Sequence, residues 1–388
     1  MSYGVILVRS DIDRFAHHTL FANELLPAFA ARNVEVRILD YISESKKVFG
    51  SLQHPDCKFF LTFNGFGTEL RMPTLKIGSL DSAFDVFGKP VFDLMHDCPA
   101  HETMAHQLNS TFPQRRLLAT DYTYASMAQQ MGIRDVTLVP SITFPAALEG
   151  ADTPPERDIE LLLAIGTSPP QIFANRISTA TSKGRLFKSV FDEVTALCAN
   201  AWNVDPSQAL IAALQSLGIP FQVAVPEHRF LLTVVLDYVK FVRRQELVRA
   251  LSDLPVTLVP DRDGDYPKGF KVEKPRNAIE LIAMMRRSRV VVCPTTHFTG
   301  HHERPLSAFT ASSAVISAPN RVLSAAFTDG HDIAFGNDAA SIGKLVRQLL
   351  DDPDAARRMG ERGHERAMQL YHPDRLVSTV LNRMQPLP

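Results

Sequence analysis

Apolar runs and segments of helical spacing alternate along the first 140 residues. Short apolar runs bounded by polar turns are typical of strands buried on both faces, and apolar residues three and four positions apart indicate amphipathic helices. The runs predict six strands, at residues 4–10, 34–41, 58–64, 90–95, 117–120 and 136–139, with helices at 17–31 and 124–131. Because strands and helices alternate, we expect a parallel, doubly wound sheet.

A second alternating segment follows a polar, proline-containing stretch at residues 149–158, which we interpret as an interdomain linker. The segment predicts strands at residues 159–165, 255–260, 270–273, 290–293, 314–317 and 333–335, and helices at 278–287, 341–350 and 354–369. The pattern at about 185–254 is helical and longer than one crossover requires. It therefore predicts an insertion, with a possible short strand at 221–225 and with Arg243, Arg244 and Arg249 outside the apolar stripe.

Polar side chains follow three of the predicted strands in the first half. Asp11 and Asp13 follow the first strand, Asn64 the third, and His96 and Asp97 the fourth. Ligands of doubly wound sheets bind beyond the carboxyl ends of the strands, so these positions are candidates for a site. The two aspartates also suit helix capping. His96 and Asp97 suit either a general base that contacts a sugar hydroxyl or a pair that stabilises its own loop.

In the second half, a charged loop separates the strand expected at 290–293 from a short helix expected to begin at Pro305. The loop carries three histidines, a glutamate and an arginine: His297, His301, His302, Glu303 and Arg304. Free amides and the helix dipole at such a helix start favour an anion. The alternative is that Glu303 and Arg304 form a solvated surface pair.

Composition narrows the classes of partner. Lys and Arg number 41 and Asp and Glu 42, giving a net charge of -1, which argues against nucleic acid as a partner. No apolar run approaches the roughly 20 residues that span a bilayer, so we expect at most peripheral membrane contact. The four cysteines are scattered and the N-terminus has no leader pattern. We expect reduced thiols in a cytoplasmic protein.

Four landmarks in order resemble the donor-binding half of group 1 glycosyltransferases. They are residues 300–317, 328–332 (T-D-G-H-D), 349–353 (L-L-D-D-P) and 360–363 (G-E-R-G). The resemblance is closest to the spore-maturation-protein-B-like branch, in which a short E-R-P-L segment opens the donor-site helix. It covers the last third of the chain strongly and the rest in outline.

The resemblance implies a GT-B fold, in which two Rossmann-like domains face a cleft and a C-terminal helix crosses back to the first domain. The expected divisions are an acceptor domain at 1–148, the linker at 149–158, a donor domain at 159–370 and the crossover helix at 371–388, with a break in helical pattern at Pro373. It also implies transfer of a sugar from a nucleotide diphosphate donor in bacterial polysaccharide or glycoconjugate biosynthesis. No metal or other cofactor is expected, and the acceptor is a saccharide, a lipid or a protein.

The resemblance also implies roles for individual residues. The expected catalytic residues are His96, Asp97, Asp13 and Glu303. The expected donor-binding residues are Gly166, Thr167, Arg176, Lys183, His301, Glu303, Arg304, Pro305, Leu306 and Ser307. In this scheme Arg176 and Lys183 hold the diphosphate, and Glu303 binds sugar hydroxyls.

The sequence departs from the family at one point. Retaining members carry two glutamates eight positions apart, whereas those positions are Thr299 and Ser307 here, and Glu303 is the surviving acid. Two other functions therefore stay open. One is a GT-B-like sugar-nucleotide epimerase, and the other is a degenerate glycosyltransferase that binds sugar nucleotides without turnover.

Overall fold

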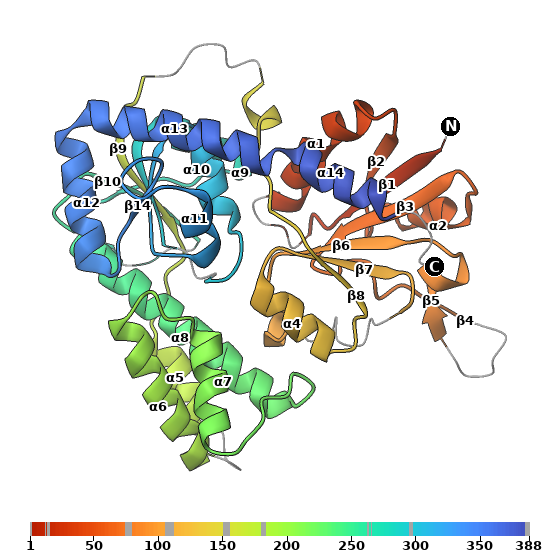
Figure 1. Cartoon of the computed structure of the whole chain (residues 1–388), viewed down its shortest axis with the longest axis horizontal. Coiled ribbons are helices and arrows are strands. Elements are labelled where there is room, and N and C mark those ends of the chain that lie inside the picture. Colours follow the sequence, from red (N-terminus) through yellow and green to blue (C-terminus); the bar gives the residue numbers. More distant parts are fainter. Residues whose placement is uncertain are drawn as a thin grey trace. The chain divides into compact units, whose positions relative to one another are not determined.

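The computed structural model describes residues 2–384 except 12, 14–15, 74–79, 105–111, 150–155, 180–183, 262–263, 265 and 295–297. The chain forms two compact units (Figure 1). Unit 1 comprises residues 1–147 and 371–388, and unit 2 comprises residues 148–370. Most of the linker predicted at 149–158 lies outside the described residues. None of the described helices is both long and apolar enough to cross a membrane.

Unit 1 is built on a six-stranded parallel sheet in the order β2-β1-β3-β6-β7-β8. The strands are β1 (Tyr3–Val8), β2 (Glu35–Asp40), β3 (Cys57–Phe63), β6 (Val91–Met95), β7 (Arg115–Ala119) and β8 (Asp135–Leu138). The helices are α1 (His17–Ala30), α2 (Ser45–Gln53), α3 (Ala83–Val86), α4 (Tyr122–Gln130) and α14 (Pro373–Asn382). The chain leaves β1 towards β2 and returns to β3 on the other side, so the topological switch point lies between β1 and β3.

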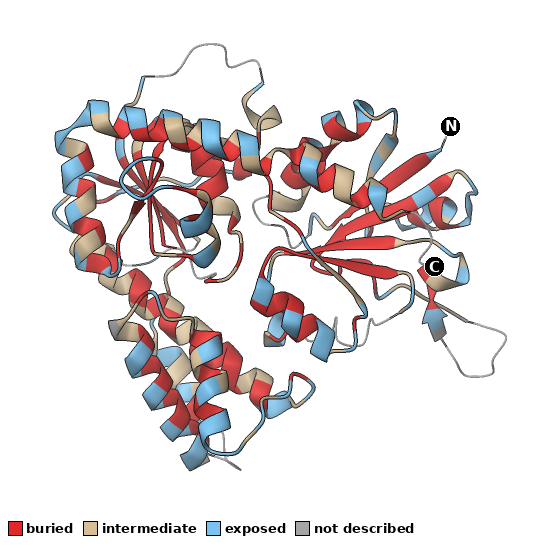
Figure 2. Cartoon of the chain, in the orientation of Figure 1, coloured by how far each residue is buried: buried red, intermediate tan, exposed pale blue. Residues whose placement is uncertain are grey.

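Burial explains why the central strands of the first sheet are mostly apolar. Every residue of β1, β6 and β7 is buried, and Figure 2 shows the central strands of both units in the colour of buried residues. In the register, Ile6 lies beside Ile38 of β2 and Leu61 of β3. A strand flanked on both sides and covered on both faces has no solvent-facing positions that would alternate with apolar ones.

Helix α14 completes unit 1 by packing on α1. The apolar face of α14 is fully buried at Leu376, Val377 and Val380. The Arg32 guanidinium donates hydrogen bonds to the Asp374 carboxylate at 2.7 Å and to the Ser378 hydroxyl at 3.0 Å. The break predicted at Pro373 is therefore the start of a separate helix that docks on the first unit.

Unit 2 has a second parallel sheet, in the order β11-β10-β9-β12-β13-β14. Its strands are β9 (Ile159–Ile165), β10 (Val256–Pro260), β11 (Lys271–Val272), β12 (Ser288–Cys293), β13 (Ala314–Ser317) and β14 (Ala334–Phe335). The helices outside the insertion are α9 (Ala278–Arg286), α10 (Glu303–Thr310), α11 (Arg321–Ala326), α12 (Ala339–Asp351) and α13 (Pro353–Tyr371). The switch point lies between β9 and β12. Two parallel, doubly wound units confirm the predicted fold class.

The described residues of the insertion between β9 and β10 form helices joined by loops. The insertion comprises α5 (Gln171–Thr179), α6 (Gly184–Asn200), α7 (Pro206–Ser216) and α8 (Pro226–Ala250), so it starts earlier than the expected residue 185. The possible strand at 221–225 is wrong, because these residues form a loop and turn that lead into α8. The outward placement is also wrong for Arg243 and Arg244, because they are 4% and 9% exposed, and it is confirmed for Arg249, which is exposed.

Unit 1 also contains one short hairpin among its described residues. The antiparallel pair of β4 (Arg71–Pro73) and β5 (Leu80–Ser82) has no counterpart in the predicted elements.

The G-E-R-G landmark on α13 allows close packing in unit 2. A Cβ atom on Gly360 would lie 2.1 Å from the Ser312 carbonyl oxygen, and one on Gly363 would lie 2.6 Å from that of Asp332. Only glycine permits these approaches.

Candidate functional sites at the carboxyl ends of the two sheets

In unit 1, Asn64 joins the turn after β3 to the loop after β6. Its side-chain oxygen accepts hydrogen bonds from the backbone amides of His96 at 2.9 Å and Asp97 at 3.2 Å. Its side-chain nitrogen donates to the Asp97 carboxylate at 2.8 Å. Asn64 is 5% exposed, whereas Asp97 is exposed. The three predicted residues therefore come together at one point on the sheet edge.

The His96 imidazole lies among aromatic rings. Its centroid is 4.7 Å from that of Phe21 and 6.5 Å from that of Phe63, with which it is stacked. This packing fixes the plane of a half-buried ring at the end of β6. A ring held in this way beside an exposed carboxylate suits a general base or a hydrogen-bond partner for a ligand hydroxyl.

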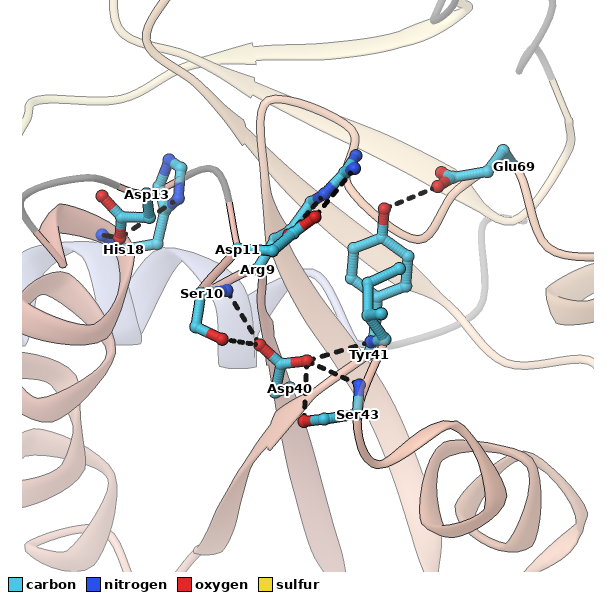
Figure 3. Close-up of polar contacts among 10 residues, drawn as sticks. Arg9, Ser10, Asp11, Asp13, His18, Asp40, Tyr41, Ser43 and Glu69 are labelled. Atoms are coloured by element: carbon cyan, nitrogen blue, oxygen red, sulfur yellow. Dashed lines mark hydrogen bonds and ion pairs between the residues drawn. The ribbon is translucent and has the colours of Figure 1, made fainter.

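Asp13 caps α1. Its carboxylate accepts hydrogen bonds from the backbone amides of His17 at 2.8 Å and His18 at 2.7 Å, and Figure 3 shows it beside the His18 ring. Burial lowers the pKa of His18, and the nearby carboxylates of Asp13 and Asp97 oppose this only in part. The capping interpretation is therefore confirmed for Asp13, and its catalytic role stays a prediction. Asp11 instead pairs with Arg9 at 2.9 Å.

The remaining polar contacts in Figure 3 fix the loops after β1 and β2. The Asp40 carboxylate accepts hydrogen bonds from the Ser10 hydroxyl at 2.6 Å and from the Ser43 amide at 2.8 Å. Partial burial raises the pKa of Asp40, but these hydrogen bonds outweigh it and hold the pKa well below its usual range. The Tyr41 hydroxyl donates to Glu69 at 2.8 Å. Burial first, and then this bond, raises the pKa of Tyr41.

In unit 2, the ends of β9 and β10 are tied together at Gly166 and Thr167. A Cβ atom on Gly166 would lie 2.3 Å from an Asp261 carboxylate oxygen, so a larger residue here would displace the Asp261 side chain. The Thr167 amide donates to the other Asp261 oxygen at 3.3 Å, and the Thr167 hydroxyl lies 3.0 Å from that of Tyr266. Gly166 and Thr167 thus lie at the carboxyl end of β9, as their position after the apolar run predicts.

Arg244 is the main feature of this site that the sequence does not predict. It comes from the last third of α8, and its guanidinium donates to the Gly166 carbonyl at 2.9 Å. Its Nε is buried and has no hydrogen-bond partner among the described residues. Burial, and then the charge of Arg304, lower the pKa of Arg244 to about 9, against the attraction of Asp261, Asp237 and Glu303. A buried cation with an unused donor is therefore held beside the Glu303–Arg304 segment.

Helix α10 begins at Glu303, two residues before the predicted start at Pro305. His302 caps it, because its Nδ1 accepts the Arg304 amide at 3.1 Å, and the same atom lies 3.4 Å from the Glu303 carboxylate. Leu306 is fully buried, and the Ser307 hydroxyl donates to the Glu303 carbonyl at 3.0 Å. The Glu303 side chain is 27% exposed, so its carboxylate is open to solvent in part.

Four other residues that the sequence analysis singled out in the second half have different surroundings. Arg176 lies in the last turn of α5, where its guanidinium is 5.1 Å from the centroid of the Phe230 ring of α8. This places it in the helical insertion rather than at the end of β9. Lys183 and His297 lie outside the described residues. Burial lowers the pKa of His301 to about 4, so this imidazole is neutral at pH 7 and adds no positive charge to the site.

Among the described residues, no three His, Cys, Asp or Glu side chains are grouped so that they could hold a metal ion. The four cysteines are all free and buried.

Comparison with solved structures identifies the fold. Sucrose-phosphate synthase from Thermosynechococcus elongatus matches 99% of this chain and 98% of its own, with 12% identity and a TM-score of 0.52. HepE from Anabaena, solved in complex with UDP-glucose, matches 98% of this chain and 100% of its own, with 10% identity and a TM-score of 0.52. The chain has the GT-B fold.

A family model described as "Glycosyl transferase-like" matches residues 210–382. This range includes α8 with Arg244 and the whole of α10, so the matched part of the chain carries the candidate site of unit 2. No curated protein matches the sequence. Together the GT-B fold and the family match support a group 1 glycosyltransferase.

Proposed function

We propose that this GT-B protein transfers a sugar from a nucleoside diphosphate donor bound on unit 2 to an acceptor bound on unit 1. The observation that carries the proposal is Arg244, a buried cation beside Glu303 and Arg304 at the switch point of the second sheet, whose Nε has no hydrogen-bond partner among the residues that the structure describes. Cations and a helix start stabilise the negative charge that a leaving diphosphate develops. No metal is needed in this scheme, because the protein itself supplies the positive charge.

The contacts around α10 support the proposed donor arrangement. In this proposal Arg244 and Arg304 hold the diphosphate, and the partly exposed Glu303 carboxylate accepts hydrogen bonds from sugar hydroxyls. Gly166 leaves room for a close approach of the phosphates to the backbone after β9. HepE binds UDP-glucose in its solved complex, which supports a nucleotide sugar as the donor class. The E-R-P-L start of α10 further favours the spore-maturation-protein-B-like branch.

The acceptor site belongs to unit 1 in this proposal. Asn64 holds the backbone of His96 and the Asp97 carboxylate at the carboxyl edge of the first sheet. A carboxylate and an imidazole in this arrangement suit recognition and deprotonation of an acceptor hydroxyl. The acceptor is a saccharide, a lipid or a protein that presents such a hydroxyl.

A thermal-shift screen of the full chain against UDP-, dTDP-, GDP- and ADP-sugars tests the proposal. A donor at a concentration of about 100 times its dissociation constant stabilises the folded protein by about 2.7 kcal/mol. This raises the melting temperature clearly. We expect one nucleotide class to raise it. If none of the four does, the proposal is wrong. Binding of a donor without formation of any product would favour a non-catalytic protein that binds sugar nucleotides. Ser307 is the observation that favours this alternative, because it replaces the second glutamate and its hydroxyl donates to the Glu303 carbonyl of its own helix.

His96→Ala is expected to lower kcat while donor affinity stays unchanged. A general base contributes about 100- to 10,000-fold to rate, and His96 lies on the unit that does not hold the donor. The measurements are kcat and the dissociation constant for the donor, taken separately. His54→Ala is the control, because His54 lies beside Tyr3 near the amino ends of β1 and β3. A lower melting temperature with normal kcat would show that His96 only orders its loop.

A further inference from the structure

A buried ion pair joins two neighbouring strands of the first sheet, β6 and β7, near the candidate acceptor site. Asp93 of β6 and Arg115 of β7 lie on neighbouring strands, and their side chains are 0% and 1% exposed. Arg115 uses Nε, at 3.1 Å, and a terminal nitrogen to donate to the same Asp93 oxygen, Oδ2. Such a pair is weak evidence for stability, because removing two charges from water costs about as much as their attraction returns. Stability alone therefore does not explain why this buried ion pair is present.

The second oxygen of Asp93 has a different partner. Oδ1 accepts a hydrogen bond from the backbone amide of Gly65 at 2.7 Å. Arg115 thus holds the carboxylate from one side, and the carboxylate holds the turn after β3 from the other. The pair connects β7 to that turn through the interior of the sheet.

The turn that Asp93 holds has an uncommon backbone. Asn64, Gly65 and Gly67 have φ values of 49°, 72° and 79°, all in the left-handed region. Such a conformation costs a non-glycine residue about 1–3 kcal/mol and persists only where its surroundings enforce it. The Thr68 hydroxyl also donates to the Gly65 carbonyl at 2.6 Å. The turn is therefore fixed by bonds on both sides of Gly65.

Asn64 uses this conformation to reach the next loop. The left-handed backbone directs its amide at the end of β6, where it makes three hydrogen bonds to His96 and Asp97. A continuous series of hydrogen bonds thus runs from Arg115 through Asp93 and the Asn64–Gly65 turn to the His96–Asp97 loop.

We propose that Asp93, held by Arg115, is a positioning residue for the His96–Asp97 pair, acting through the Gly65 amide and the Asn64 side chain. The inference rests on the proposed function, because His96 and Asp97 matter for turnover only if they serve the acceptor. Asp93 contacts no substrate. It fixes the Asn64–Gly65 turn, and Asn64 in turn holds the backbone of the loop after β6 in place.

The double variant Asp93→Leu with Arg115→Met tests this. Replacing a buried pair by apolar residues of similar size is often neutral or stabilising, so we expect the fold to survive. The Gly65 amide loses its acceptor, however, and we expect kcat to fall by about 100-fold, the usual cost of a displacement of about 1 Å at a site. Donor affinity is expected to stay within about twofold of wild type. A stable double variant with wild-type kcat and wild-type exchange of the His96 and Asp97 amides would overturn the proposal.

Asn64→Gly provides a second variant that leaves the core intact. Glycine adopts φ near 50° without strain, so only the amide bonds to His96 and Asp97 are lost. We expect the same fall in kcat and faster hydrogen exchange of the His96 and Asp97 amides. If the double variant does not fold, this variant decides, and wild-type kcat together with wild-type exchange of the His96 and Asp97 amides in it overturns the proposal. Arg32→Met, which removes an ion pair elsewhere in unit 1, is the control and is expected to keep wild-type kcat.

Amide exchange separates this inference from the proposed function. If His96→Ala keeps full kcat, the catalytic role of His96 fails, whereas faster exchange at His96 and Asp97 in both test variants still supports positioning by Asp93. If His96→Ala is inactive and both test variants keep wild-type kcat and exchange rates, the positioning role fails alone.

Discussion

Replacing Arg244 with glutamine is expected to weaken nucleoside diphosphate binding by about 10- to 150-fold. A hydrogen bond to a charged group contributes about 1.5–3 kcal/mol, which corresponds to that range in dissociation constant. Glutamine keeps much of the side-chain length but removes the charge. Because Arg244 also donates to the Gly166 carbonyl, we expect a lower melting temperature as well. Calorimetric titration with UDP, or with the nucleotide that the screen selects, measures the affinity of the folded protein.

Two neighbouring arginines on α8 provide controls for Arg244. Arg243 is equally buried, but its guanidinium donates to the Cys198 carbonyl at 2.7 Å and to the Ala201 carbonyl at 3.0 Å, within the helical insertion. Arg243→Gln is expected to lower stability and leave the affinity of the folded fraction unchanged. Arg249 is exposed, and Arg249→Gln is expected to change neither. If Arg244→Gln binds the nucleotide like wild type, Arg244 only supports the turn after β9.

Glu303→Gln is expected to remove most activity and leave the fold intact. Its carboxylate is 27% exposed at the start of α10, and it lies 3.4 Å from His302. Glutamine preserves the shape and can still accept a hydrogen bond, but it loses the charge that strengthens a bond to a sugar hydroxyl. We expect turnover to fall by about 10- to 150-fold, from the loss of about 1.5–3 kcal/mol.

The measurement for Glu303→Gln is turnover with the donor that the screen identifies, together with the melting temperature. Glu361→Gln is the control, because Glu361 lies on α13 and pairs only with the exposed Arg357 among its described contacts. Unchanged donor affinity and unchanged turnover in Glu303→Gln would remove Glu303 from the proposed site.

The sequence predicts the fold well because it is built from strands buried on both faces. Short, continuous apolar runs such as 159–165 and 290–293 are typical of such strands, and both belong to the second sheet. The hairpin of β4 and β5 escapes prediction because strands of three residues are too short to show a period. The loop at 221–225 resembles a strand because Val223 is buried there without belonging to a sheet.

The site is harder to predict, because it depends on side chains that meet only in the folded chain. Asn64, His96 and Asp97 are recognisable by their place after strands, but nothing local indicates that the Asn64 amide reaches the next loop. The pattern assigns Arg244 to the outer face of a long helix because charged residues in an apolar pattern are usually solvated. The available signal is the pair Arg243–Arg244, since adjacent arginines on a helix covered on several sides cannot both point to water.

The packing of α14 on α1 makes the first unit discontinuous along the chain. Residues 148–370 are synthesised between its two parts, so the apolar surface of α1 that Leu376 and Val377 cover stays open until the ribosome has made the whole second unit. Domains otherwise fold in order from the N-terminus during synthesis. A premature stop shortly before residue 373 would thus harm the part of the protein made first, and an expression fragment that ends at residue 147 would lack one of its own helices.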